Sequence, residues 1–244
     1  MSKRQFLIRT ARESDIEAIA NLEKTVFGPL GTGYYGEEHI QSWLQTFPQG
    51  LLVAELGGAV VGYISGQLIE FNCFDLSGLL DIDQATQGGL MISSHRPKGN
   101  ALYGFTVCSV AHGAGSRLNQ AYLELAQTLH KRYYVGHVRL AGFASYYNSM
   151  LLDDSVDLTG LKQDDIALWY ALNTVRRVGG TVWPNVVDPG IECLPEPANP
   201  DSVLRMHLRL PGCGLVAVVP KCLRDPQGGN YCALMAIDLF DLVK

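Results

Sequence analysis

Hydrophobic residues recur along this chain at two different spacings, and the alternation between them predicts a mixed α/β fold. Short apolar runs bounded by turn residues predict strands at residues 6–9, 51–55, 59–66, 135–143, 214–219 and 231–239. Apolar positions at helical spacing predict helices at residues 37–46, 116–133, 158–178 and 201–210, and a first helix that opens at Ser14. The connecting sequence is loop-like, above all at residues 28–36, 72–100 and 182–200.

Local signals define some of these elements more closely. Ser14 stands three residues before Glu17, which is the spacing of a capping box, so we expect the first helix to be capped by this pair. Gly57 and Gly58 separate two predicted strands and indicate a tight hairpin between them. We expect the last two strands to close the sheet as an antiparallel pair.

The segment from Leu102 to Leu118 carries the strongest candidate chemistry. An apolar, β-branched run ends in a loop of small residues at 111–115, and a helical pattern begins at Ser116. Backbone N–H groups at a helix N-terminus carry partial positive charge, and glycines allow an anion to come close. This loop is therefore a candidate phosphate site. It is neither a P-loop nor a dinucleotide fingerprint, because no Gly-Lys-Ser/Thr follows Gly113 and Leu118 stands where a third glycine would fall.

The sequence Val110-Ala111-His112-Gly113-Ala114-Gly115 resembles the R/Q-x-x-G-x-G/A loop of the GNAT superfamily of acyl-CoA-dependent acyltransferases. Val110 departs from the usual Arg or Gln, but the family binds the CoA pyrophosphate mainly through backbone amides. The segments at 47–50 (FPQG), 102–104 (LYG) and 201–207 (DSVLRMH) are similar to a longer subgroup. That subgroup includes acetyltransferases fused to carbon–nitrogen hydrolases, and GNAT-like polyketide loading domains look related. The resemblance extends over residues 6–239.

The resemblance implies the GNAT fold, an α/β architecture with a mixed, mostly antiparallel sheet flanked by helices and with splayed central strands. It implies a single domain over residues 1–244, with elaborated loops at 28–50, 72–100 and 145–200. The splayed fourth and fifth strands would form a groove for the pantetheine of CoA, with residues 105–109 on one side and residues 137–143 on the other.

The resemblance also implies the roles of individual residues. Four strand residues would bind the pantetheine and the thioester: Thr106, Val107, Cys108 and Ser109. A backbone N–H among the last three of these would stabilise the oxyanion. The pyrophosphate would be bound by Val110, His112, Gly113, Ala114, Gly115 and Ser116. His207 stands where most members have the tyrosine that protonates the CoA thiolate, and an imidazole serves as acid or base near neutrality. The base for an incoming amine stays open among Glu70, Asp75, Asp81, Asp83, His95, His112 and His137.

Composition narrows the classes of function. The 19 Lys and Arg residues against 24 Asp and Glu give a net charge of −5, which argues against a nucleic-acid binder. No apolar run approaches 18 residues and Met-Ser-Lys-Arg-Gln leads directly into a strand pattern, so we expect no membrane span, no secretory signal and a cytoplasmic location. The six cysteines form no CxxC pair, which favours free thiols. No spacing of His, Cys, Asp and Glu indicates a metal site.

We therefore expect an N-acetyltransferase-like enzyme that moves an acetyl or other short acyl group from acyl-CoA to an amine of a small molecule or peptide, with His207 as general acid and no metal. One alternative is a GNAT-like decarboxylase of malonyl-type thioesters that loads a carrier protein, with Thr174 or Thr106 beside the histidine. Another is a non-catalytic acyl-CoA-binding module, since Val110 and His207 depart from the family pattern. A carrier protein would dock on basic residues such as Lys131, Arg132, Arg139, Arg176 and Arg177. The acceptor, the acyl group and the oligomeric state stay open.

Overall fold

The structure is a computed structural model that describes residues 6–243. The chain divides at Gly136 into two compact units, and strand β5 (Tyr133–Arg139) runs from the first into the second. The single domain expected over residues 1–244 stays a prediction. The N-terminal pentapeptide, on which the expectation of no secretory signal partly rested, lies outside the described residues. Within the described chain no helix is both long enough and apolar enough to cross a membrane.

The first unit is built on strands that pair in chain order. Strands β1 (Leu7–Thr10), β2 (Leu51–Leu56), β3 (Ala59–Ile69) and β4 (Ala101–Ser109) are antiparallel neighbours, and β4 then pairs in parallel with the start of β5. The predicted hairpin between β2 and β3 is confirmed. Gly57 and Gly58 both adopt positive φ there, a conformation that glycine adopts without a steric penalty.

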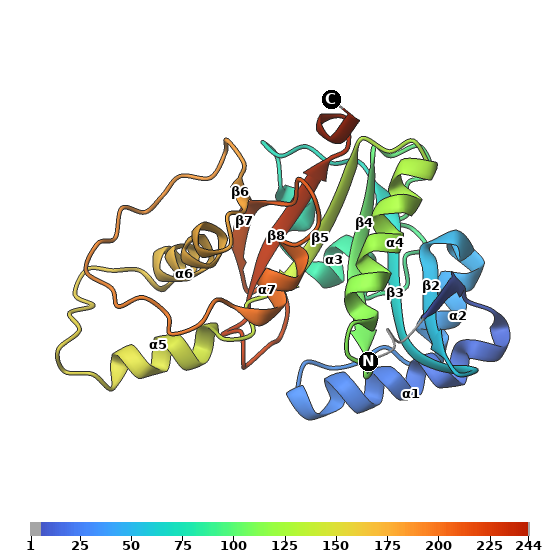
Figure 1. The fold of residues 1–244 in the computed structure, drawn as a ribbon, viewed down its shortest axis with the longest axis horizontal. Coiled ribbons are helices and arrows are strands. Elements are labelled where there is room, and N and C mark those ends of the chain that lie inside the picture. Colours follow the sequence, from blue (N-terminus) through green and yellow to red (C-terminus); the bar gives the residue numbers. More distant parts are fainter. Residues whose placement is uncertain (1–5, 244) are drawn as a thin grey trace. The chain divides into compact units, whose positions relative to one another are not determined.

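Four helices belong to the first unit: α1 (Ile16–Phe27), α2 (Glu37–Thr46), α3 (Ile82–Thr86) and α4 (Ala114–Thr128). Helix α4 lies along β3 and β4 (Figure 1) and buries Leu118 and Tyr122 against the strands. Helix α1 also packs on β3 and β4 and contacts α2. Helix α3 interrupts the predicted loop 72–100 with one short helical segment.

The start of α1 corrects one prediction. The expected Ser14–Glu17 capping box is absent, and a single 3-10 turn at Glu13–Asp15 precedes the helix. Asp15 makes the capping contact instead, because its carboxylate accepts the Arg12 N–H at 2.8 Å and pairs with the Arg9 guanidinium at 2.7 Å. The bound guanidinium lowers the pKa of Asp15. Asp15, rather than Ser14, therefore binds the backbone at the start of this helical segment.

The second unit contains the predicted antiparallel pair, β7 (Gly214–Pro220) and β8 (Tyr231–Asp238), with the short β6 (Thr181–Val182) parallel to β7. Helix α6 (Gln163–Arg177) packs on β7 and contacts α7 (Ser202–His207). Helix α5 (Phe143–Leu151) was not predicted, and the strand expected to reach residue 143 ends at Arg139. The apolar run of α5 is too short to distinguish a helix from a strand by periodicity.

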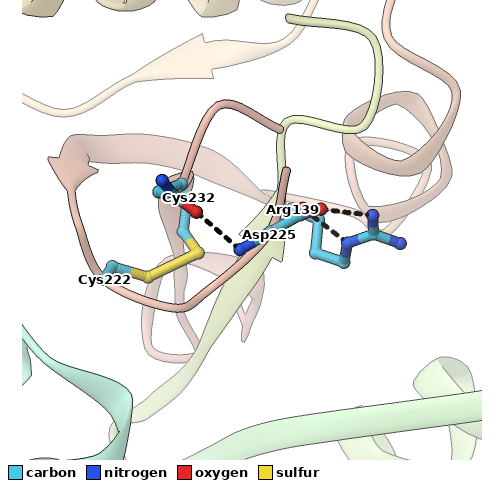
Figure 2. The surroundings of a disulfide bond; sticks show 5 residues. Arg139, Cys222, Asp225 and Cys232 are labelled. Carbon is cyan, nitrogen blue, oxygen red and sulfur yellow. Dashed lines mark hydrogen bonds and ion pairs between the residues drawn. A yellow bond between two sulfur atoms is a disulfide. The ribbon is translucent and has the colours of Figure 1, made fainter. Parts of the chain in front are cut away.

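Two of the six cysteines are not free thiols. Cys222 and Cys232 form a disulfide with their Cα atoms 6.2 Å apart (Figure 2), so the prediction of six free thiols is wrong for this pair. Cys232 lies opposite Val219 in the β7–β8 ladder, and Cys222 follows two residues after the end of β7. The hairpin therefore brings together two cysteines that the spacing in sequence did not indicate as partners.

Candidate functional site

The register between strands β3 and β4 shifts by one residue in the middle of β4. Ser65 of β3 lies opposite Thr106, but the next residue, Gly66, lies opposite Gly104, so Phe105 is an extra residue in a β-bulge. In the described part of the chain, the parallel ladder between β4 and β5 covers Ala101–Gly104 and ends at the same place. Residues 105–109 therefore continue beside β3 alone, as expected for splayed central strands. Bulges occur frequently next to active sites because they redirect the side chains that follow.

Gly66 makes this bulge sterically possible. A Cβ atom on Gly66 would lie 2.2 Å from the carbonyl oxygen of Tyr103 and 2.7 Å from the hydroxyl of Tyr122. The fully buried Tyr122 side chain of α4 crosses the strands here and donates its hydroxyl to the carbonyl of Gly50 at 2.6 Å. Opposite Gly66, a Cβ atom on Gly104 would lie 3.5 Å from the ring of the same tyrosine, which is an ordinary contact distance. The bulge was not predicted, although an isolated glycine inside a strand pattern is a signal for one.

The loop after β4 leads directly into a helix N-terminus. Val110 still donates its N–H to Val61 at 3.0 Å, and Gly113 then adopts φ +88° as the N-cap of α4. The helix begins at Ala114, two residues before the predicted Ser116. The first N–H groups of a helix have no acceptor within the helix and can bind an anion. Here the N–H of Ala114 donates to the Ala111 carbonyl at 3.1 Å, so the candidate donors are those of Gly115 and Ser116. The side chains of Val110 and His112 are exposed, whereas Ala114 and Gly115 are buried.

The side chains of the four predicted strand residues have different environments. Cys108 is buried, and its thiol donates to the carbonyl of Leu22 at 3.6 Å. Burial, with the nearby Glu23 carboxylate, raises the pKa of Cys108 to about 12, so this thiol is not a nucleophile near neutrality. Thr106 hydrogen-bonds with its side chain to Glu23. Val107 and Ser109 are half-buried. Cys108 would therefore meet a ligand mainly through its backbone.

His207 ends helix α7 in the second unit. Its Nδ1 lies 3.0 Å from the Val203 carbonyl, so this nitrogen carries the proton and Nε2 is the acceptor of the neutral ring. Burial lowers the pKa of His207, with Asp201 and the Val203 bond acting in the opposite direction. The neutral ring is thus favoured near pH 7. As a general acid, His207 must first take up a proton at Nε2.

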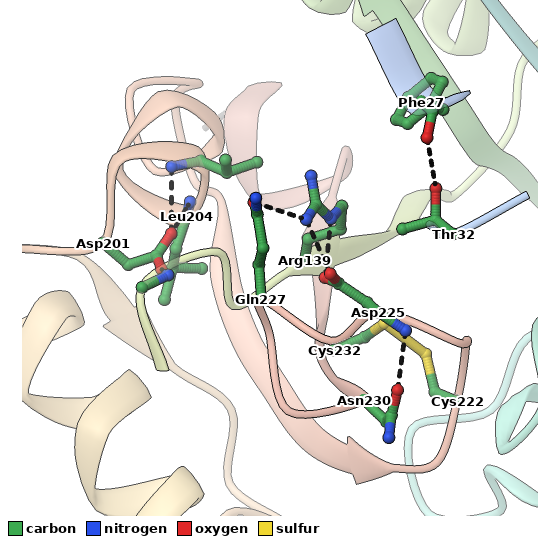
Figure 3. Close-up of polar contacts among 12 residues, drawn as sticks. Phe27, Thr32, Arg139, Asp201, Leu204, Cys222, Asp225, Gln227, Asn230 and Cys232 are labelled. Atoms are coloured by element: carbon green, nitrogen blue, oxygen red, sulfur yellow. Dashed lines mark hydrogen bonds and ion pairs between the residues drawn. A yellow bond between two sulfur atoms is a disulfide. The ribbon is translucent and has the colours of Figure 1, made fainter. Parts of the chain in front are cut away.

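Asp201 organises the helix that carries this histidine. Its Oδ1 accepts the N–H groups of Val203 and Leu204 at 3.0 Å, as Figure 3 shows for Leu204. Its Oδ2 accepts the N–H of Gly142 at 2.9 Å and the hydroxyl of Tyr170 at 3.2 Å. The hydroxyl of Thr174 accepts the Asp201 N–H at 3.1 Å, so this threonine holds the cap in place.

The second unit also contains an ion pair that the sequence analysis missed. Arg139 on β5 binds the fully buried Asp225 through Nε and Nη2, both at 2.7 Å (Figures 2 and 3). Asp225 lies in the loop closed by the Cys222–Cys232 disulfide, and its own N–H donates to Asn230 at 2.8 Å. The two charged residues are 86 positions apart, and no local pattern links them.

The other predicted acids and bases are explained by local structure. Glu70, Asp75, Asp81 and Asp83 are all exposed. Asp75 accepts from Ser77, which lowers its pKa, and Asp81 caps α3 through the N–H of Gln84. His95 accepts the Leu68 N–H at 3.2 Å and lies against the ring of Phe47. Within residues 6–243, no cluster of three His, Cys, Asp or Glu side chains could hold a metal.

No protein-family model matches this chain. The chain is 29% identical over 193 residues to the probable hydrolase YhcX of Bacillus subtilis (strain 168), a match over 75% of this chain and 36% of that protein. It is 26% identical over 167 residues to the uncharacterized N-acetyltransferase YkwB of the same organism, over 65% of this chain and 73% of that protein. The chain thus spans about a third of the length of the first of these relatives.

Two solved structures share the fold over nearly their whole length. The GphF GNAT-like decarboxylase in complex with isobutyryl-CoA has a TM-score of 0.66 at 20% identity, with 96% of this chain and 99% of that chain covered. The loading GNATL domain of CurA from Lyngbya majuscula has a TM-score of 0.63 at 18% identity, with 97% and 99% covered. The chain therefore has the GNAT fold, as the resemblance in the sequence predicted.

Proposed function

We propose that this chain is an acyl-CoA-dependent acyltransferase that moves an acetyl or other short acyl group from CoA directly to an amine. The observation that carries the proposal is the β4–α4 segment, in which the bulge at Phe105 is followed by a left-handed Gly113 and the N-terminus of α4. One segment thus offers a free strand edge for the pantetheine amides and backbone N–H groups for the pyrophosphate. The YkwB similarity also supports the assignment to acetyl transfer.

In this proposal the chemistry is a direct displacement at the thioester. The amine attacks the carbonyl carbon and forms the C–N bond, while the carbonyl electrons move to oxygen. A backbone N–H of Val107–Ser109 stabilises that oxyanion, because an aimed dipole is more effective where water is excluded. When the C–S bond breaks, the thiolate takes a proton from His207, which therefore has to hold one at Nε2 at that moment.

A substitution at Gly113 tests the phosphate-binding part of the proposal. Gly113→Glu places a carboxylate at the anion site and adds backbone strain at φ +88°, so acetyl-CoA binding should fall below detection in calorimetry. Gly58→Glu is the matched control, since Gly58 has φ +85°, an open environment and a place in the β2–β3 hairpin. Retained binding in Gly113→Glu, or equal loss in both variants, would refute the assignment of this loop.

A second candidate function is decarboxylation of a malonyl-type thioester with transfer to a carrier-protein thiol. The similarity in fold to the GphF decarboxylase and to the CurA loading domain favours it, and a buried histidine that is neutral near pH 7 suits proton transfer to and from carbon. The two functions differ in a product that is easily measured, because only decarboxylation releases CO2 from malonyl-CoA.

A further inference from the structure

A carboxyl group is buried between α1 and the bulged part of β4. Glu23 is 1% exposed, and both of its oxygens accept hydrogen bonds. Oε1 accepts the hydroxyl of Tyr63 and, at 3.3 Å, the hydroxyl of Thr106. Oε2 accepts the backbone N–H of Tyr35 at 3.0 Å. The side chain therefore links α1, the loop before α2, β3 and β4.

The surroundings of Glu23 are aromatic and uncharged. Trp43 stacks on Tyr63, and Phe105, the extra residue of the bulge, packs edge-on against Trp43 and Tyr35. Within the described residues, Glu23 has no ion-pair partner. A buried carboxyl without a cation costs stability, so packing alone does not account for it.

The titratable groups that face Glu23 are Tyr63, Tyr35 and Cys108, and the carboxyl is the most acidic group among them. Burial raises the pKa of the Glu23 carboxyl, and the hydrogen bonds from Tyr63, Tyr35 and Thr106 oppose the rise. Burial and the proximity of Glu23 also raise the pKa values of Tyr63, Tyr35 and Cys108, so these three stay protonated. An acid with a raised pKa is suited to accept a proton near pH 7.

The hydroxyl of Thr106 connects this carboxylate to the strand that we assign to the thioester. Thr106 follows the bulge directly and is 8% exposed, against 1% for Glu23. We propose that Glu23 accepts, through the Thr106 hydroxyl, the proton that the attacking amine loses. This inference rests on the proposed acyl transfer and supplies the base that the sequence left open.

Each proton and electron pair of this step can be followed through the acyl-transfer reaction. As the C–N bond forms, the proton on nitrogen moves to the Thr106 oxygen, and the Thr106 proton moves to Oε1 of Glu23. Glu23 ends the step as a neutral acid, and the C–S electron pair leaves with the thiolate. Glu23 then loses its proton to water after the amide product has left. Thr106 would be the catalytic residue of this step, and Glu23 acts through it as a positioning residue and proton store.

Glu23→Gln separates the charge of the side chain from its geometry. The Gln oxygen can accept the Tyr35 N–H, and its amide can donate to Tyr63 and Thr106 once both hydroxyls turn, so the hydrogen bonds are kept and the proton acceptor is lost. Glu17→Gln is the control, because Glu17 is exposed on the same helix. Thr106→Val removes the relay hydroxyl and Thr106→Ser restores it.

The assay follows acetyl-CoA consumption across pH with two probe amines, n-propylamine and hydroxylamine, of which the second is uncharged near neutrality. For n-propylamine we expect kcat to rise with pH through the Glu23 titration in the wild type and in Glu17→Gln. In Glu23→Gln and Thr106→Val we expect kcat to be about 100-fold lower than in the wild type and not to rise with pH. Thr106→Ser should recover most of the wild-type kcat. We expect the same loss with hydroxylamine, because its nitrogen also gives up one proton as the C–N bond forms, although this amine arrives uncharged.

Each outcome decides between the two proposals. If the wild type transfers acetyl groups and Glu23→Gln keeps its rate and its pH profile, the role of Glu23 is refuted while acyl transfer stands. If the rate falls in Glu23→Gln but the rise with pH remains, Glu23 is only a structural residue. If the wild type binds acetyl-CoA but transfers its acetyl group to neither amine, amine acylation and the Glu23 assignment fail together.

Discussion

Replacing Gly66 by alanine tests whether the bulge of β4 depends on the absence of a side chain. The new Cβ would lie 2.2 Å from the Tyr103 carbonyl oxygen and 2.9 Å from its carbon, and neither backbone atom can rotate away. It would also lie 2.7 Å from the Tyr122 hydroxyl, which is held by its bond to Gly50. The strand pair or the tyrosine must move to accommodate one methyl group.

The size of the effect follows from these contacts. Overpacking in a well-packed core costs about 1–3 kcal/mol of stability. A displaced Tyr122 hydroxyl would also leave buried polar groups without hydrogen bonds, which costs about 1–3 kcal/mol more. We therefore expect Gly66→Ala to lower the free energy of unfolding by about 3 kcal/mol or more. For a chain of this length, that corresponds to a fall in Tm of about 6–12 °C.

Urea denaturation and calorimetry measure this change directly. Gly78→Ala is the control, because Gly78 lies in an exposed turn with no atom within 4 Å of the new Cβ and without a positive φ. Its free energy of unfolding should change by less than about 0.5 kcal/mol. A Gly66→Ala protein as stable as this control would show that the bulge tolerates a side chain, and the steric account of β4 would be wrong.

Three further predictions concern single residues. Asp225→Ala leaves the Arg139 guanidinium without its partner and should cost about 2–4 kcal/mol in urea denaturation; a change below about 0.5 kcal/mol would show that the pair contributes little. Burial raises the pKa of Glu23, so the folded wild type holds that proton more tightly than the unfolded chain does. The stability of the wild type should therefore fall as the pH rises above the ordinary carboxyl range, whereas that of Glu23→Gln should not. The Tm of Glu23→Gln relative to wild type should increase from pH 4 to pH 8, and a constant difference would contradict the burial argument. His207→Gln should lower turnover about 100-fold while the Kd for acetyl-CoA stays the same, whereas unchanged turnover would exclude His207 from proton transfer.

The parts of the fold that follow from local pattern were predictable. The β2–β3 hairpin has a glycine pair at its turn, and the β4–α4 segment has an apolar run, a glycine loop and a helical repeat in direct succession. For the same reason the loop after β4 and the helix that follows it were predictable, and the binding of phosphate there stays a prediction. Helix α5 was missed because its short apolar run fits a strand as well as a helix.

The buried polar contacts depend on residues far apart in the chain and were not predictable. Glu23 and Thr106 are separated by 83 positions, and Arg139 and Asp225 by 86. One signal was present, since Glu23 lies four residues after the buried Ile19 on the inward face of its helix. A carboxyl on that face predicts a buried acid, but the side chains that surround it depend on how β3 and β4 are paired.

The central claim is that the chain transfers acyl groups from CoA to amines. The most direct measurement titrates the purified protein with acetyl-CoA and with malonyl-CoA in a calorimeter, and then follows each thioester by mass spectrometry with and without n-propylamine. The account predicts that acetyl-CoA binds, stays intact alone and yields N-propylacetamide when the amine is present, while malonyl-CoA keeps its carboxylate. Release of CO2 from malonyl-CoA would establish the decarboxylase instead, and binding of neither thioester would contradict the account.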